Sequence, residues 1–219
     1  SRLMMYLLSS PIQDGGQWDM FVNLIEKYGV VPQSVMPESF QSSRSAMMNR
    51  FITRKLREFA WTLRKMNDKG IKMAELRKTK EGMLSTIYSM LCICLGNPPE
   101  SFDWQVRDKD KKFIRINNLS PQDFYKKHVN VDLKEKVCLI HAPMSNKEMN
   151  ELYTVSYLGN VVGGQIINYA NVEIDDMKRA AIKSIKNNEA VWFGCDVGKM
   201  FHRDLGVMDT DLYDYESLF

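Results

Sequence analysis

The sequence predicts an α+β fold whose helices are concentrated in the first half of the chain. Two observations support this: two long amphipathic segments lie between residues 43 and 95, and short alternating apolar segments follow from residue 102. Across 219 residues, 44% are hydrophobic and 26% charged, which is ordinary globular usage and excludes a collagen, low-complexity or coiled-coil protein. No apolar run approaches the roughly 18 residues of a membrane span, so no membrane partner is expected.

The first predicted helix follows a pair of glycines. Gly15 and Gly16 favour a turn, and a helix is expected from about Gln17. Gly29 suits a left-handed cap at its end, and Pro32 prevents the helix from resuming. Apolar residues recur at helical spacing in between: Met20, Phe21, Leu24, Ile25 and Tyr28.

Two longer helices are expected next, over residues 43–67 and 73–95. Gly70 separates them, Gly82 is expected to interrupt the second helix early, and the run Gly96–Pro99 stops it. Such a short connection predicts an antiparallel helical hairpin.

The second half contains shorter elements. Alternating apolar residues predict two strands on either side of the turn-prone stretch 108–112, and Ser120-Pro121 marks a helix start. Strands are also expected at 136–143, 151–158 and 190–197, the last of them buried, with a turn at Gly163-Gly164. A helix over 174–188 is expected to turn its apolar residues inward: Ile174, Met177, Ala181, Ile182 and Ile185.

Metal and nucleophile motifs are absent from the sequence. The four cysteines form no CxxC pair and the three histidines lie far apart, so we expect no metal site, no cofactor and buried, reduced thiols. Reduced thiols are typical of the cytoplasm. Cys195, with Asp196 and His202 nearby in the sequence, is weighed as a nucleophile against a core position, and the core position is favoured. His128 and His141 are expected to be surface or hydrogen-bonded core groups.

The charge distribution is more informative than the net charge of +3. Between Arg44 and Lys80, twelve basic residues and three acidic ones give +9, whereas residues 203–219 carry −4. The basic helical face is solvated, contacts an acidic surface of another subunit, or binds a polyanion such as nucleic acid. No aromatics are expected to interleave with the bases as in single-strand binders. The residues proposed for this face are Arg50, Arg54, Lys55 and Arg57.

Four segments together resemble one family: residues 14–32 (DGGQWDMFVNLIEKYGVVP), 92–113 (CICLGNPPESF and WQVRDKDKKF), 151–164 (ELYTVSYLGNVVGG) and 189–201 (EAVWFGCDVGKMF). They resemble, in order and over essentially the whole chain, the bleomycin hydrolase family of papain-like cysteine aminopeptidases. The resemblance implies that Gly15 and Gly16 border the substrate cleft, where the backbone pairs with an extended peptide, and that Gln17 and Trp18 follow on the non-primed wall.

The resemblance also implies a division of the chain. Residues 1–42 would belong to the helical half of a papain-like fold, residues 43–133 to a large, mainly helical insertion with a short β-hairpin, and residues 134–219 to the return into the fold and the start of its β-rich half. The family's Gln…Cys-Trp motif, its general-base histidine and its Asn-Ser-Trp-Gly motif do not occur in this sequence.

The chain is therefore expected to be an internal fragment with no catalytic residue of its own, inactive alone. The parent enzyme would hydrolyse peptide or amide bonds as a cytoplasmic homo-oligomer, a hexamer by family resemblance. The alternative is a non-catalytic module, derived from that family, for oligomerisation or nucleic-acid binding. Because a fragment ending after the 190–197 strand would expose apolar faces and a strand edge, the isolated chain is expected to oligomerise or bind hydrophobic dyes.

Overall fold

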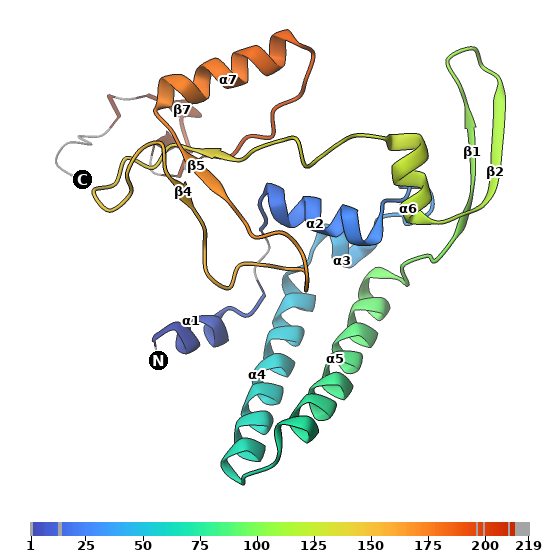
Figure 1. The fold of residues 1–219 in the computed structure, drawn as a ribbon, viewed down its shortest axis with the longest axis vertical. Helices are drawn as coiled ribbons and strands as arrows, with labels where there is room; N and C mark the ends of the chain where they lie inside the picture. The colour runs from blue at the N-terminus through green and yellow to red at the C-terminus, as the bar shows by residue number, and fades with distance from the viewer. Residues whose placement is uncertain (1, 13–14, 196, 199, 210, 213–219) are drawn as a thin grey trace. The chain divides into compact units, whose positions relative to one another are not determined.

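The computed structural model describes residues 2–12, 15–195, 197–198, 200–209 and 211–212. The chain divides into two compact units, one of Ser1–Cys138 with Thr154–Asn168 and one of Leu139–Tyr153 with Tyr169–Phe219. Both units combine helices with small sheets (Figure 1), as the predicted α+β class requires. No helix in the described part of the chain is long and apolar enough to cross a bilayer.

The first unit begins with three helices, α1 (Arg2–Ser9), α2 (Trp18–Tyr28) and α3 (Phe40–Ser43). The predicted start and end of α2 are confirmed: Gln17 is its N-cap, and Gly29 ends it with a φ of 76°. Gly29 is needed for a second reason, because a Cβ there would lie 2.2 Å from the carbonyl carbon of Pro121. The short helices α1 and α3 were not predicted.

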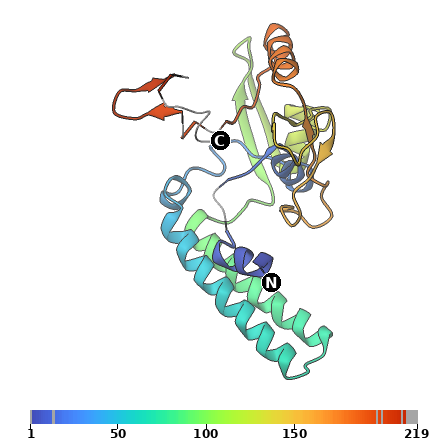
Figure 2. The same cartoon turned by 90° about the vertical axis from the view of Figure 1, so that its left-hand side faces the viewer.

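The predicted helical hairpin is confirmed. α4 (Ala46–Asp68) and α5 (Met73–Leu95) run antiparallel and pack side by side in both ribbon views (Figures 1 and 2). They bury Ile52 of α4 together with Leu76 and Ile87 of α5. The predicted interruption at Gly82 is wrong, because a glycine costs a helix only about 1 kcal/mol relative to alanine, which packing against α4 can offset.

The hairpin formed by β1 (Phe102–Arg107) and β2 (Phe113–Leu119) is antiparallel, as predicted. It leads into α6 (Pro121–Phe124), where the predicted cap is confirmed: the Ser120 hydroxyl accepts a hydrogen bond from the N–H of Asp123 (3.1 Å). α6 continues as a single π-helical turn, η1 (Tyr125–Val129). Residues of α2 and of this region form the core of the unit: Val22, Ile25, Tyr125 and Leu133.

The second unit holds two small sheets. β5 (Tyr169–Asn171) pairs in parallel with β3 (Leu139–Ile140) and antiparallel with β4 (Leu152–Tyr153). α7 (Ile174–Lys186) follows β5, and β6 (Phe201–His202) pairs with β7 (Val207–Met208). The strands predicted over 136–143 and 151–158 are thus far shorter than expected.

One buried amide supplements these short strands. The side chain of Asn171 is 0% exposed. Its Oδ1 accepts from the N–H of Ala142 (2.9 Å), and its Nδ2 donates to the carbonyl oxygen of Glu148 (3.1 Å). Because the side chain satisfies backbone groups of the loop, the loop stays ordered without a longer ladder.

Two predictions about apolar segments of the second unit are wrong. Residues 190–195 and 197 form no strand, and Trp192 and Phe193 are 61% and 72% exposed; Asp196 lies outside the described residues. Three of the α7 residues expected to face inward, Ile174, Ile182 and Ile185, are exposed. An apolar pattern is buried only where another layer faces it, so the pattern alone does not determine whether these side chains are buried.

Candidate functional site

The segment predicted to face a peptide lies directly before α2. Gly15 and Gly16 are exposed, and a Cβ at either position would meet no described atom within 4 Å. Their backbone therefore borders open space on the side where a side chain would project. Both glycines lie within three residues of Trp18, the first residue of a well-packed helix.

Gln17 contributes to the local structure at this point. Its backbone is extended (φ −140°), and its side-chain Oε1 accepts a hydrogen bond from the N–H of Asp19 (3.0 Å). This contact satisfies one of the free N–H groups at the start of α2. Gln17 therefore fixes where α2 begins and where the extended segment ends.

Trp18 anchors the same segment to the core of the first unit. The residue is half-buried and packs against the cluster of Val22, Ile25, Tyr125 and Leu133. Its ring centroid lies 5.7 Å from that of Phe21. The structure thus brings Gly15, Gly16, Gln17 and Trp18 together as one continuous surface strip held at its C-terminal end by an aromatic side chain.

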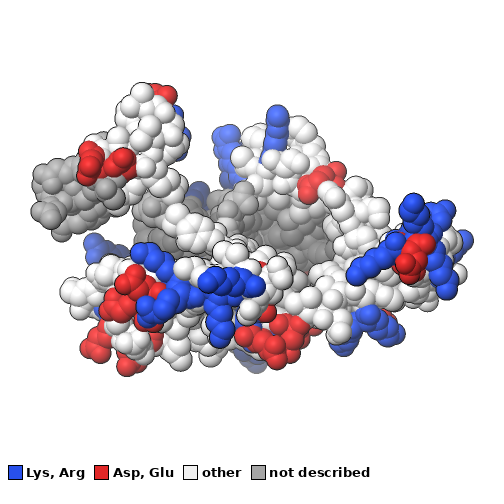
Figure 3. Space-filling model, turned by 90° about the horizontal axis from the view of Figure 1, so that it is seen from above, with Lys and Arg blue, Asp and Glu red and all other residues white. Residues whose placement is uncertain are grey.

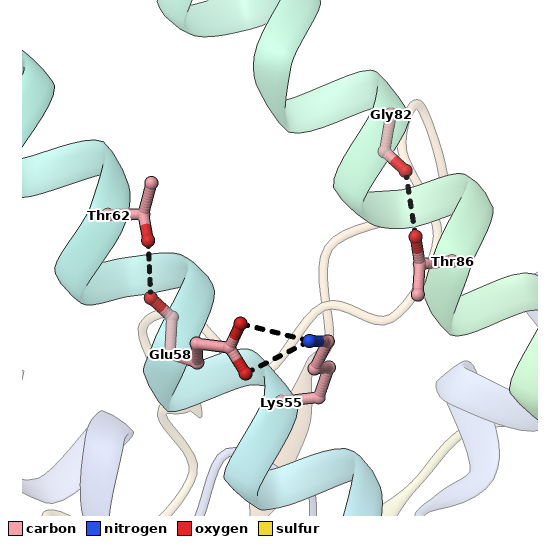
Figure 4. A network of polar contacts seen from close by, with 5 residues as sticks. All are labelled: Lys55, Glu58, Thr62, Gly82 and Thr86. Atoms are coloured by element: carbon pink, nitrogen blue, oxygen red, sulfur yellow. Dashed lines mark hydrogen bonds and ion pairs between the residues drawn. The ribbon is translucent and has the colours of Figure 1, made fainter.

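The four residues predicted for a basic face differ in their surroundings. Lys55 pairs with the Glu58 carboxylate (2.9 Å, Figure 4). The guanidinium of Arg57 donates to the carbonyl oxygens of Leu8 (2.6 Å) and Ser9, which ties α1 to α4. Arg50 and Arg54 are exposed on α4. Among the contacts described, Lys55 and Arg57 therefore have partners within the chain, and Arg50 and Arg54 do not.

Aromatic rings do accompany these bases, contrary to the sequence prediction. The Lys55 ammonium lies 5.1 Å from the ring centroid of Phe59, and that of Lys65 lies 4.0 Å from that of Trp61. Spacings of four residues put a base and a ring on the same side of a helix.

A second concentration of charge lies at the tip of the β1–β2 hairpin, where Figure 3 shows basic side chains around acidic ones at its right-hand edge.

The cysteines and histidines form no nucleophile–base pair in the described part of the chain. Cys138 is half-buried, and burial, with a smaller contribution from Asp19, raises the pKa of its thiol. A raised pKa disfavours the thiolate that a nucleophile requires. Cys195 is exposed, so the prediction that it is a core residue is wrong. His202 Nδ1 accepts from the N–H of Leu205 within its own turn (3.3 Å).

The other two histidines occupy ordinary positions, as predicted. His141 Nδ1 lies 3.0 Å from the carbonyl oxygen of Val172, and the His128 ring lies 4.8 Å from the ring of Trp104. Among the described residues, no group of three or more histidine, cysteine or acidic side chains is arranged to hold a metal ion.

Comparison with known proteins adds the family. The model of the Peptidase C1-like family matches residues 1–219, the whole chain. The chain belongs to the Peptidase C1-like family.

Three relatives show how far the similarity extends. Human bleomycin hydrolase is 46% identical over 220 residues, covering 100% of this chain and 48% of that protein. Aminopeptidase C of Listeria monocytogenes is 49% identical over 219 residues, covering 100% of this chain and 49% of its own length. The crystal structure of PepW from Lactobacillus rhamnosis is 46% identical with a TM-score of 0.91, covering 100% of this chain and 49% of that one. This member of the Peptidase C1-like family thus spans about half the length of these relatives, and the resemblance found in the sequence is confirmed.

Two residues that hold α2 in this member of the Peptidase C1-like family, Asn23 and Gly164, were not predicted to do so from the sequence. Asn23 lies on the apolar side of α2, between the buried residues Val22 and Ile25, and is itself buried. A polar residue at a core position of an amphipathic helix signals a specific partner, because an unpaired amide is costly to bury. Its partner is the backbone of Gln165, next to Gly164, for which the sequence predicts only a turn.

Proposed function

We propose that this chain supplies one wall of the substrate cleft of a papain-like cysteine aminopeptidase. The observation that carries the proposal is the open strip at Gly15–Gly16, next to a helix that is packed firmly into a core. An extended peptide would pair its backbone with this strip as an added strand. Residues with a Cβ at these positions would project into the space that the peptide needs.

The proposed chemistry is acyl transfer to a thiolate supplied by a cysteine outside these 219 residues. The sulfur would bond to the carbonyl carbon of the first peptide bond, and the amine would leave with a proton from a general acid. Water would then hydrolyse the thioester and release the free acid. In this proposal the present chain binds and aligns the peptide, and its own four cysteines take no part.

The same proposal assigns the α4–α5 and β1–β2 hairpins to an insertion over residues 43–133 of a papain-like fold. Residues 1–42 and 134–219 would form the flanking parts of that fold. Their similarity to bleomycin hydrolase and aminopeptidase C along the whole chain supports this assignment.

Valine substitutions in the full-length protein test the proposal. Gly15→Val and Gly16→Val are each expected to lower kcat/KM for aminoacyl fluorogenic substrates at least tenfold, about 1.4 kcal/mol of transition-state stabilisation. Gly194→Val is the matched control, because Gly194 is also exposed with open space around it and lies far along the chain from the strip. Unchanged kcat/KM in both wall variants would show that the strip does not border the cleft.

A second role is suggested for the basic helical face, as a contact between subunits of a homo-oligomer. Large apolar side chains are exposed on α4 beside the arginines, notably Met47, Phe51 and Trp61. Exposed apolar side chains mixed with arginine are typical of protein interfaces. The Lys55–Phe59 and Lys65–Trp61 pairs also fit a nucleic-acid surface, so the experiment must distinguish the two roles.

Charge reversal distinguishes a contact between subunits from a nucleic-acid-binding site. Arg50→Glu with Arg54→Glu in the full-length protein is expected to shift sedimentation towards smaller species. Binding of a single-stranded oligonucleotide, measured across a salt series, should stay unchanged. An unchanged oligomer together with lost, salt-dependent oligonucleotide binding would favour the nucleic-acid role instead.

A further inference from the structure

A buried amide joins α2 to a loop 142 residues further along the chain. Asn23 Oδ1 accepts from the N–H of Gln165 (2.7 Å), and its Nδ2 donates to the carbonyl oxygen of Gln165 (3.0 Å). One side chain thereby satisfies both backbone groups of one residue, as a neighbouring strand would. Asn23 is only 6% exposed, so water competes little for these bonds.

Gly164 permits this close approach. A Cβ on Gly164 would lie 2.8 Å from Asn23 Cγ and 3.0 Å from its two terminal atoms. The preceding Gly163 has a different requirement: its φ is 78°, and a Cβ on it would meet no described atom within 4 Å. The first glycine of the pair therefore makes the turn, and the second allows the loop to seat against α2.

Two further contacts join the same elements. The Asp19 carboxylate accepts from the N–H of Asn168 (2.9 Å), and Asn160 Nδ2 donates to the carbonyl oxygen of Met20 (3.0 Å). The buried side chain of Ile167 lies between these points in the loop. We call the loop 160–168 with its contacts to Asp19, Met20 and Asn23 the α2 clamp.

The α2 clamp holds the part of α2 that adjoins the open strip. Its three attachment points on α2 lie within the first two turns, directly after Gly15–Trp18. A helix is stiff, so a shift or rotation of these turns would carry the strip with it. We propose that Asn23 and Gly164 are positioning residues, which set where the Gly15–Trp18 strip meets a peptide.

Substitutions in the α2 clamp are therefore expected to weaken substrate binding, although the clamp residues do not contact the substrate themselves. The inference rests on the proposed function of the strip, because it assumes that the strip binds a peptide. An added methyl at residue 164 would either displace the Asn23 amide from its two hydrogen bonds to Gln165 or push the loop and α2 apart, and both changes alter the α2 clamp. Precise alignment of a peptide is sensitive to displacements of that size.

A double-mutant cycle in the full-length protein tests the proposal. Gly164→Ala is expected to raise KM for peptide substrates at least fivefold while kcat changes less than twofold. In an Asn23→Ala background, where the crowded atoms are gone, Gly164→Ala should raise KM less than twofold further. Gly82→Ala and Asn67→Ala, both at exposed helical positions, are controls expected to leave KM unchanged.

Asn23→Asp offers a variant that keeps the shape of the side chain. At neutral pH it places a carboxylate against the Gln165 carbonyl oxygen and should raise KM. At a pH low enough to protonate the new carboxyl, the donor is restored, and KM relative to the unmodified protein should fall back. This rescue would not follow from a general loss of stability.

The results also separate this inference from the proposed function. If Gly15→Val and Gly16→Val lower kcat/KM but both KM and kcat are unaffected by Gly164→Ala and Asn23→Asp, the positioning role is wrong and the cleft wall stands. Additive effects of Asn23→Ala and Gly164→Ala would equally overturn it. If the Gly15 and Gly16 variants have no effect, the proposed function itself fails, and the positioning role with it.

Discussion

The carboxylate of Asp103 on β1 accepts a hydrogen bond from the backbone N–H of Asn118 on β2 (2.9 Å). Asn118 has a left-handed φ of 52°, and the register of the hairpin shifts between Phe102 and Trp104. The Arg115 guanidinium lies 3.3 Å from the same carboxylate. The Asp103 side chain thus bonds to the backbone of β2 at the point where the hydrogen-bond ladder between β1 and β2 is interrupted.

This carboxylate makes the hairpin sensitive to acid. The hydrogen bond from Asn118, and then the Arg115 guanidinium, lower the pKa of Asp103 below its usual value. Because the folded pKa is the lower one, the added stability is present above the unfolded pKa and lost as pH falls through the folded pKa. We expect Tm to fall less steeply between pH 5 and 2 in Asp103→Asn than in the unmodified protein. Scanning calorimetry measures Tm at each pH. Equal slopes of Tm against pH in the two proteins would contradict this prediction.

Gly29 should be far less tolerant of substitution than Gly70. Both have positive φ, 76° and 74°, but only Gly29 has backbone atoms of Pro121 in the way of a Cβ. Gly70→Ala should cost about 1–2 kcal/mol from the left-handed backbone alone. Gly29→Ala should cost clearly more, because α2 and α6 must separate. Urea unfolding compares the two, and equal losses would mean that the approach of Pro121 is unimportant.

The α4–α5 hairpin should depend on one isoleucine of α4. Ile52 is 1% exposed, whereas Ile93 of α5 is 85% exposed. Ile52→Ala is expected to destabilise the protein by about 2–5 kcal/mol, since it removes buried methyl groups and leaves a cavity. Ile93→Ala should change stability by less than about 0.5 kcal/mol in the absence of a covering partner. A larger loss at Ile93 would show that another surface covers it.

The thiols should differ in reactivity. Cys195 is exposed, while Cys138 is half-buried with a raised pKa, so at pH 7.5 iodoacetamide should label Cys195 first. Mass spectrometry of digested, partly labelled protein gives the order directly. Cys195→Ser should also leave kcat within about twofold, since the proposed nucleophile lies elsewhere. A complete loss of activity in that variant would overturn the chemical assignment.

Signals that act within a few residues were predicted well. The cap at Ser120 and the glycine after α2 depend on local hydrogen bonds and backbone conformation, so the sequence nearby determines them. The helical hairpin was also predictable, since its periodic apolar residues extend over many turns and its connection is short.

Features that depend on distant partners were not predicted. The apolar stretch around Trp192 and Phe193 has the composition of a buried strand, yet a strand forms only where another segment pairs with it. The two-residue strands near Asn171 rely on a buried amide rather than on a long ladder. Within the candidate site, the position of Gly15–Trp18 before a helix could be predicted, but the contact of Asn23 with Gln165 could not.

The contact between Asn23 and Gln165 also has a topological meaning. It joins the two ends of the segment between Asn23 and Gln165, which contains both hairpins. This segment therefore begins and ends beside the Gly15–Trp18 strip. Loop closure depends only logarithmically on length, at about 0.6 kcal/mol per doubling. The turn between α4 and α5, residues 69–72, can therefore accept inserted residues, or even a small grafted domain, at little cost to the geometry of the strip. This protein offers a scaffold in which a distal hairpin can be redesigned while the region beside α2 stays unchanged.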